Sequence, residues 1–281
     1  MEIIRTIPEL KEKIRQIRAS GKTIGFVPTM GYLHEGHLSL VRSAGKDCSF
    51  VVVSIYVNPI QFGVGEDFEE YPRDLTGDAM LCEKEGVDLI FAPSDKDMYP
   101  RGYVTFVDVE NLTEGLCGRN RPGHLRGVTT VVTKLFNLVE PHKAYFGQKD
   151  AQQALVLKKM VEDLNMNLEL IISATVREED GLAMSSRNTY LSEKERKAGL
   201  VLYKSLQKAE ELIERGCRKS QDIIREMENI INQEPLVQID YVEIVDTTDL
   251  KRIEELKERV LIALAVKVGK TRLIDNIMVE V

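Results

Sequence analysis

The stretch that decides the fold reads Phe26-Val27-Pro28-Thr29-Met30-Gly31-Tyr32-Leu33-His34-Glu35-Gly36-His37-Leu38-Ser39-Leu40. It begins with an apolar run, breaks at Pro28 and Gly31, and becomes apolar again from Leu38. This pattern predicts a strand, a turn and a helix. In an open α/β sheet, ligands bind where a strand ends, because the amides and the positive dipole end of the next helix point there. The stretch therefore predicts both an α/β fold and a ligand site.

Two of the four histidines of the chain, His34 and His37, lie in this stretch. A spacing of three residues places them on the same side of a helical turn, and Gly36 between them allows a ligand to approach the backbone. Each imidazole can donate an N–H to a phosphate oxygen without carrying a charge. An isolated histidine pair is more often a surface or capping feature, but the glycine-containing turn in front of it favours a nucleotide site.

The composition is that of an ordinary soluble protein, with 281 residues, 43% hydrophobic and 30% charged residues. A net charge of −7 argues against a broad nucleic-acid surface. No apolar run approaches the roughly 20 residues of a membrane span, and the first residues lack a signal pattern. The four scattered cysteines form no metal or disulfide pattern. We therefore expect a cytoplasmic protein that binds neither nucleic acid nor membrane.

Strand-like and helix-like segments alternate through the first part of the chain. Strands are predicted over residues 23–27, 50–57, 87–91, 104–109, 143–146 and 168–175, and helices over 7–19, 75–85, 128–139 and from 152. Two helices over 192–215 and 221–232 then precede strands over 239–245, 260–267 and 277–281. This order predicts an α/β fold: a Rossmann-like parallel sheet in an N-terminal domain over 1–175, with a smaller α+β C-terminal lid domain over 176–281.

Further polar residues follow the predicted strands. Gln61, in Asn58-Pro59-Ile60-Gln61, offers an amide donor and acceptor suited to a hydroxy acid, although a lone glutamine is more often a solvated loop residue. Lys149 follows the strand over 143–146 and could reach phosphates, although a surface lysine is the usual alternative. Asp78 is either a magnesium ligand or a helix-dipole partner. A basic loop is either flexible or a cover for anions through Arg121, His124 and Arg126.

Five segments together resemble one family. They follow the patterns PTMGxLHxGH, NPxQFG, CGxxRPGHxRGV, FGxKDxQQ and SSRN, and they occur in the order and spacing of the pantothenate synthetase (pantoate:β-alanine ligase) family. The HxGH pattern alone is similar to a wider superfamily of nucleotidyltransferases and class I aminoacyl-tRNA synthetases. Met184-Ser185-Ser186-Arg187-Asn188 stands where tRNA synthetases carry a lysine-serine loop, and it fits the ligase family better.

The resemblance implies ATP-dependent condensation of (R)-pantoate with β-alanine to pantothenate, AMP and diphosphate through a pantoyl adenylate. ATP would be a substrate accompanied by Mg²⁺, whose ligands stay unassigned, and the protein would be a homodimer. Catalytic roles are implied for His34, His37 and Lys149, and pantoate contacts for Gln61, Gln153 and Met30. The implied ATP-binding residues are Met30, Gly31, Tyr32, Leu33, His34, Glu35, Gly36, His37, Gly147, Gln148, Lys149, Asp150, Val176, Met184, Ser185, Ser186 and Arg187.

Two other functions use some of the same residues. Another adenylyl-transferring member of the HxGH superfamily would need the histidines, but would not be expected to combine NPxQF with FGxKDxQQ. A nucleotide-sensing protein that binds ATP without turnover would have no reason to keep the lysine and the Ser-Ser-Arg donors together.

Overall fold

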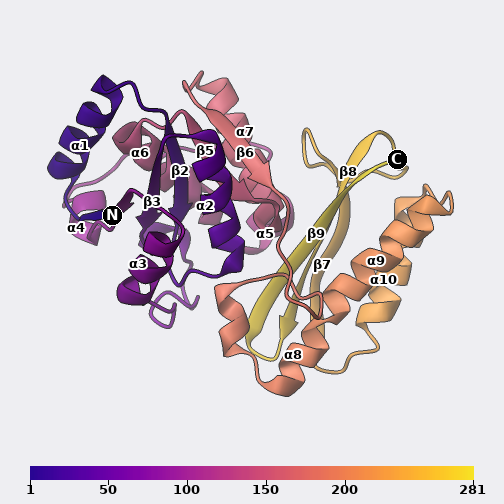
Figure 1. Ribbon diagram of the computed structural model, residues 1–281. Coiled ribbons are helices and arrows are strands. Elements are labelled where there is room, and N and C mark those ends of the chain that lie inside the picture. The colour runs from indigo at the N-terminus through magenta and orange to yellow at the C-terminus, as the bar shows by residue number, and fades with distance from the viewer. The chain divides into compact units, whose positions relative to one another are not determined.

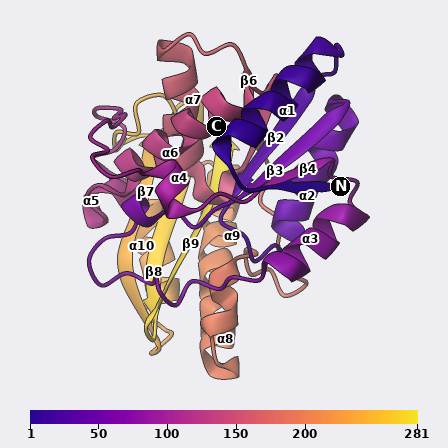
Figure 2. The same cartoon turned by 90° about the vertical axis from the view of Figure 1, so that its left-hand side faces the viewer.

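The computed structural model describes residues 1–281, and the chain forms two compact units (Figures 1 and 2). Unit 1 contains Met1–Glu110, Arg121–Gly147 and Val156–Ala174. Unit 2 contains Asn111–Asn120, Gln148–Leu155 and Thr175–Val281. The chain passes into unit 2 for the last time at Thr175, and two earlier segments also belong to unit 2. A functional division at residues 175 and 176 stays a prediction.

Unit 1 is built on a six-stranded parallel sheet, which confirms the predicted α/β class. Its strands are β1 (Glu2–Ile4), β2 (Ile24–Thr29), β3 (Phe50–Ile55), β4 (Leu89–Phe91), β5 (Lys143–Gly147) and β6 (Glu169–Ser173), in the order β1-β4-β3-β2-β5-β6. The chain leaves β2 toward β3 on one side, whereas β5 and β6 lie on the other side. The carboxyl ends of β2 and β5 therefore flank a switch point, where ligands bind in this architecture.

Helices cover both faces of this sheet (Figure 1). On one face, α6 (His124–Val139) packs beside α1 (Ile7–Ala19), and Phe136 contacts Phe26 of β2 and Phe146 of β5 with ring centroids 6.4 and 6.3 Å apart. On the other face, α2 (Glu35–Asp47) and α3 (Leu75–Lys84) cover Val27 and its neighbours. Phe26 and Val27 serve opposite faces because successive strand residues point in opposite directions. The remaining short helices of unit 1 are η1 (Pro59–Gln61) and α4 (Asp95–Met98).

Unit 2 contains an antiparallel sheet in the order β7-β8-β9, which matches the predicted smaller α+β part. Its strands are β7 (Val237–Asp246), β8 (Arg259–Val268) and β9 (Thr271–Glu280), and its helices are α5 (Leu116–Asn120), η2 (Gln148–Asp150), η3 (Ser186–Tyr190), α8 (Glu193–Gly199), α9 (Val201–Glu214) and α10 (Ser220–Ile231). Leu206 of α9 and Met227 of α10 share a core with Ile262 of β8. Helix α7 (Ala151–Asp163) begins in unit 2 and continues in unit 1.

Two predicted elements differ in the structure, and one short strand was not predicted. Residues 104–109 form no strand: Val107 bonds instead to α6, donating its N–H to Thr130 Oγ1 (3.0 Å) and accepting from Thr129 Oγ1 (2.6 Å). The predicted helix over 192–215 divides at Leu200 into α8 and α9, and the three-residue β1 was not predicted. None of the helices combines the length and the apolar character that a membrane span requires.

Gly127 allows α6 to touch the backbone of η1. A Cβ atom at this position would lie 2.5 Å from the Ile60 carbonyl oxygen and 2.7 Å from Gln61 Cα. Asn58 Nδ2 donates to the Gly127 carbonyl oxygen at 3.2 Å, which closes the contact from the other side. A larger side chain would therefore push away the segment that carries Gln61.

The basic side chains of the loop that was predicted as a possible anion cover contact other protein groups. Arg121 pairs with Glu66 through two hydrogen bonds of 2.7 and 2.6 Å, and its Nη1 lies 3.0 Å from His124 Nε2. Because a guanidinium only donates, Nε2 accepts and the His124 Nδ1–H donates to the Gln61 carbonyl oxygen at 2.8 Å. Arg126 lies over the Phe106 ring at 4.3 Å. The loop thus anchors the Gln61 segment.

Gly127→Ala is expected to lower the free energy of unfolding by about 1–3 kcal/mol, because the added methyl group meets backbone rather than a flexible side chain. Chemical denaturation measures the change. Gly45→Ala in α2 is the matched control, since its Cβ would meet only Val51 at 3.9 Å. That control is expected to gain about 0.5–1 kcal/mol from the better helix former. Equal stability of the two variants would contradict the close approach.

Glu66→Gln is expected to lower stability at neutral pH in a pH-dependent way. Burial opposes ionisation of Glu66, but Arg121 outweighs it and lowers the pKa from 4.5 to about 2. The ionised carboxylate therefore stabilises the fold above pH 4.5, and this contribution is lost as the pH falls toward 2. Unfolding curves of wild type and Glu66→Gln should converge over that window. The exposed Glu69→Gln should show no such convergence, and a constant gap for Glu66→Gln would exclude this role for Arg121.

Candidate active site

The turn between β2 and α2 has a left-handed backbone at two successive residues. Gly31 has a φ of 83° and Tyr32 a φ of 52°. A Cβ atom on Gly31 would lie 2.9 Å from both Asp78 Oδ2 and Ile55 Cγ2. The turn therefore requires glycine at this position for its backbone angle and for the space that is available.

Asp78, in the first turn of α3, holds this turn in place. Its Oδ2 accepts from the Tyr32 amide at 2.8 Å and its Oδ1 from the Leu33 amide at 2.7 Å. The side chain is buried, and desolvation raises its pKa although the two amides oppose the shift. Two roles were predicted for Asp78: its place in the first turn of α3 agrees with a helix-dipole partner, and the magnesium role stays a prediction. The carboxylate is a structural acceptor for the turn.

His34 and His37 lie together at the start of α2. His34 is the N-cap residue, and the centroids of the two rings are 4.0 Å apart with planes inclined by 35°. His37 Nδ1 accepts from the His34 backbone N–H at 3.3 Å, so a neutral His37 carries its ring proton on Nε2. The first-turn amides of α2, including those of Glu35 and Gly36, add donors at the same end. This end of α2 is suited to an anionic ligand.

Met30 and Gln61, two of the predicted pantoate contacts, are neighbours in unit 1. Gln61 is 8% exposed, and its Nε2 lies 3.2 Å from Met30 Sδ. Its Oε1 accepts from Asn58 Nδ2 at 3.0 Å, and Asn58 Oδ1 in turn accepts from the Tyr99 hydroxyl at 2.7 Å. These bonds fix the orientation of the Gln61 amide, with the donor on the side of Met30.

Asn58 and Tyr99 were not predicted as site residues. Asn58 is 1% exposed and makes three hydrogen bonds that hold Gln61 and Gly127. The sequence offered a signal for Asn58, because it directly follows a strongly apolar strand. A buried asparagine needs hydrogen-bond partners, so a structural role could have been expected there. Tyr99 carried no signal, because its hydroxyl reaches Asn58 across 41 residues of sequence.

The second predicted phosphate segment is divided between the units. Gly147 is the last residue of β5 in unit 1, whereas Gln148, Lys149 and Asp150 form η2 in unit 2. Lys149 Nζ lies 3.9 Å from Asp150 Oδ2, and its side chain is 20% exposed. Gln153, in the first turn of α7, also belongs to unit 2. Joint action of these residues with the histidines stays a prediction.

The predicted pyrophosphate loop follows a small hairpin in unit 2. The Met184 amide donates to the Val176 carbonyl oxygen at 3.0 Å, so these two predicted residues are adjacent. Ser185 is the N-cap of η3 and its Oγ accepts from the Arg187 amide at 3.3 Å. Asn188 Nδ2 ties the loop to Glu178 Oε1 at 2.7 Å and to the Ala183 carbonyl oxygen at 3.1 Å. Hydrogen bonds therefore frame the segment that carries Ser185 and Arg187, whereas Ser186 between them is buried.

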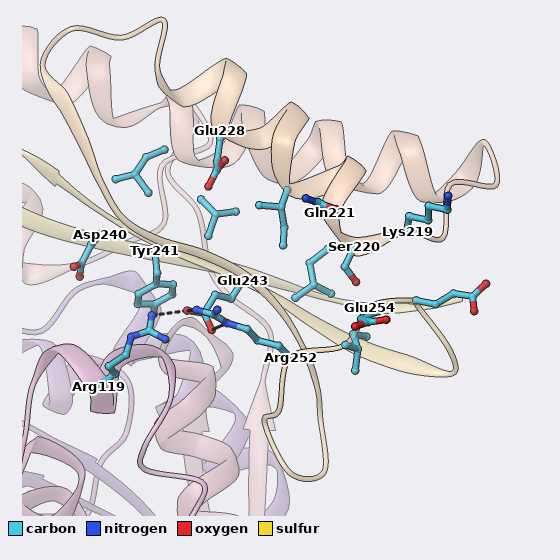
Figure 3. Close-up of a pocket in the computed structure, with 16 residues that line it drawn as sticks. Arg119, Lys219, Ser220, Gln221, Glu228, Asp240, Tyr241, Glu243, Arg252 and Glu254 are labelled. Carbon is cyan, nitrogen blue, oxygen red and sulfur yellow. Dashed lines mark hydrogen bonds and ion pairs between the residues drawn. The ribbon is translucent and has the colours of Figure 1, made fainter.

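A cavity of about 1070 Å³ in unit 2 contains none of the predicted site residues (Figure 3). Arg119 and Arg252 converge there on Glu243, at 2.5 and 2.7 Å. Burial opposes ionisation of Glu243, but the two guanidinium groups lower its pKa. The Arg119, Arg252 and Glu243 charges thus pair with one another, and Lys219, Glu228, Glu254 and Glu255 also line the cavity.

Comparisons with known proteins agree over the whole chain. A family model described as pantoate-beta-alanine ligase matches residues 2–278. The chain is 60% identical over 281 residues to a pantothenate synthetase of Acetivibrio thermocellus and 59% identical over 281 residues to one of Heliobacterium modesticaldum. Both alignments cover 100% of each chain.

Solved structures give the same result. A pantothenate synthetase structure from Thermus thermophilus superposes with a TM-score of 0.94 at 45% identity and covers 99% of each chain. A pantoate-beta-alanine ligase from Francisella tularensis, complexed with beta-gamma ATP and beta-alanine, superposes with a TM-score of 0.81 at 32% identity. That comparison covers 99% of this chain and 97% of the other. The chain therefore belongs to the pantoate-beta-alanine ligase family.

Proposed function

We propose that this chain condenses (R)-pantoate with β-alanine at the expense of ATP, giving pantothenate, AMP and diphosphate in the biosynthesis of pantothenate and coenzyme A. Membership in the family over residues 2–278 supports the reaction class. The geometric observation that supports it best is the Met30–Gln61 contact beside the histidine-bearing start of α2. An apolar thioether and an oriented amide suit a branched hydroxy acid, and the histidines suit a phosphate, which supports this assignment.

The reaction proceeds in two steps in this proposal. A pantoate carboxylate oxygen attacks the α-phosphorus of ATP, the bond to the β-phosphate oxygen breaks, and diphosphate leaves. The neutral amine of β-alanine then attacks the acyl carbon of pantoyl adenylate, AMP leaves, and the nitrogen loses a proton. Carboxylate and triphosphate repel each other, so the site must neutralise charge and align the attacking oxygen.

Each group of residues has one task in this scheme. His34 and His37 donate to triphosphate oxygens, and His37 also supplies a proton during transfer. Lys149 stabilises the charge that develops on the phosphates, and Ser185, Ser186 and Arg187 receive the diphosphate. Gln61 and Gln153 hold the hydroxyl groups and carboxylate of pantoate, and Met30 packs against it. The remaining proposed ATP contacts are Gly31, Tyr32, Leu33, Glu35, Gly36, Gly147, Gln148, Asp150, Val176 and Met184.

Magnesium enters this proposal as part of the MgATP substrate. No cluster of three or more His, Cys, Asp or Glu side chains in the structure could hold a metal ion, and both oxygens of Asp78 accept backbone amides. Magnesium commonly keeps several waters and binds through substrate phosphates. The protein residues are therefore assigned no metal-ligand role.

The organisation of the protein is part of the same proposal. Residues 1–175 would bind nucleotide and pantoate, and residues 176–281 would act as a lid that excludes water from the adenylate. We further propose a homodimer, on the strength of the family resemblance, and a cytoplasmic location, on the strength of the sequence pattern. Sedimentation of the purified chain tests the subunit count.

Purified protein is expected to release AMP and diphosphate from MgATP when pantoate is supplied, and to form pantothenate when β-alanine follows. Chromatographic quantification of the three products checks this, with pantoate omitted as the control. Release of AMP without pantoate, or ATP binding without any release, would refute the ligase function.

His37→Ala and Lys149→Ala are each expected to slow adenylate formation by ~100- to 1000-fold, the usual cost of removing one donor to a developing charge. Diphosphate release in a single turnover measures the effect. Lys143→Ala is the matched control, because this lysine stands at the opposite end of β5 and pairs with Asp47 at 3.3 Å. Near-normal diphosphate release by both His37→Ala and Lys149→Ala would remove their catalytic roles.

A further inference from the structure

We propose that Asp275 and Asn276 of β9 form a positioning pair that holds the Lys149 corner and the 176–187 loop in one fixed arrangement. Neither residue is among the substrate contacts of the proposed reaction. The inference rests on the proposed function, in which Lys149 and Ser185–Arg187 bind phosphates. All of the residues involved belong to unit 2.

Asn276 holds the Lys149 corner through its side-chain amide. Its Nδ2 donates to the carbonyl oxygens of Gln148 and Lys149, at 2.9 Å each, and its Oδ1 accepts from Gln148 Nε2 at 3.4 Å. Carbonyl oxygens can only accept, so the amide has one possible orientation. Asn276 is 3% exposed, so bulk water does not compete for these bonds in the folded chain. The backbone that carries the Lys149 ammonium is thus fixed by one side chain.

Asp275 holds the loop through Arg177. Its two oxygens accept from Arg177 Nη1 at 2.6 Å and Nη2 at 3.0 Å, a bidentate pair in which Asp275 is 2% exposed. Arg177 Nη1 also donates to the Gly181 carbonyl oxygen at 3.1 Å, and its guanidinium lies 3.9 Å from the centroid of the Tyr203 ring. Arg177 is therefore fixed by an anion, a carbonyl group and an aromatic face.

Fixing Arg177 also fixes the hairpin that leads into the Ser-Ser-Arg segment. Arg177 pairs with Ala183 in an antiparallel bridge, and the Glu178 amide donates to the Leu182 carbonyl oxygen at 2.8 Å. Gly181 has a φ of 94°, and a Cβ atom there would lie 2.5 Å from the Tyr203 ring. The hairpin therefore cannot move away from Arg177 without losing several contacts at once.

The side chains of Asp275 and Asn276 reach different segments because adjacent strand residues point to opposite faces of a sheet. Asp275 shares its face of β9 with Leu273, which packs in the core with α9, and Asn276 points away from that core. One dipeptide thereby sets both groups of phosphate donors in unit 2. The pair would act through Lys149 and the loop, and would itself touch no substrate.

The rate test is a double-mutant cycle on diphosphate release in a single turnover. Asn276→Ala is expected to slow adenylate formation by about 100-fold, the cost of a misplacement near 1 Å. Lys149→Ala combined with Asn276→Ala should be slower than Lys149→Ala alone by much less than 100-fold, because no ammonium is then left to position and only the neighbouring Gln148 and Asp150 contacts can still be displaced. Thr271→Val is the matched control, since this buried polar residue lies on the same strand and pairs with Val268. It should keep the wild-type rate.

A second readout does not depend on activity. Amide hydrogen exchange at residues 147–152 should become faster in Asn276→Ala and in the isosteric Asn276→Asp, while β7 and β8 keep their protection. Asp275→Asn should instead speed exchange over residues 177–187. Thr271→Val should change neither segment.

The outcomes separate this proposal from the function on which it rests. The positioning role would be overturned if the double variant lost the product of the rate losses of Lys149→Ala and Asn276→Ala. Unchanged hydrogen exchange at residues 147–152 in both Asn276 variants would overturn it as well. Absence of pantoate-dependent diphosphate from the wild-type protein would refute the proposed function instead. The exchange measurement would then still decide whether the pair holds the corner and the loop.

Discussion

The arrangement of the signature turn depends on one buried carboxylate, that of Asp78. It accepts the amides of Tyr32 and Leu33 and so stabilises two successive left-handed residues between β2 and α2. Without an acceptor at this place, two buried N–H groups would lose their partners, and the start of α2 would lose its orientation. The histidines owe their position to this turn. A residue of another helix thus holds the turn that precedes His34 and His37.

The proposed donors for ATP come from both compact units. Unit 1 supplies the imidazoles and the α2 amides, and unit 2 supplies the Lys149 ammonium and the Ser-Ser-Arg segment. Each group is tied by hydrogen bonds within its own unit, through Asp78 in one and through Asp275 and Asn276 in the other.

The local order of apolar and polar residues was sufficient to predict the parallel sheet, the turn after β2 and the proximity of His34 to His37. It was insufficient where the partner is distant in sequence. Alternation over residues 104–109 suggested a strand, but alternation does not reveal whether another strand lies alongside, and Val107 bonds to threonine side chains of α6. The contacts of Tyr99 with Asn58 and of Asn276 with Lys149 span 41 and 127 residues, so no local signal could have indicated them.

The interleaved course of the chain limits how the protein can be divided. A fragment that begins at residue 176 would lack Gln148–Leu155, and Asn276 would face no carbonyl groups to bind. A fragment that ends at residue 175 would leave Gln152 without the β7-β8-β9 unit to which it belongs. Recombination between relatives that keeps unit 2 from one parent therefore has to exchange three separate stretches of the gene together, because a single crossover point would combine stretches of this unit from different parents.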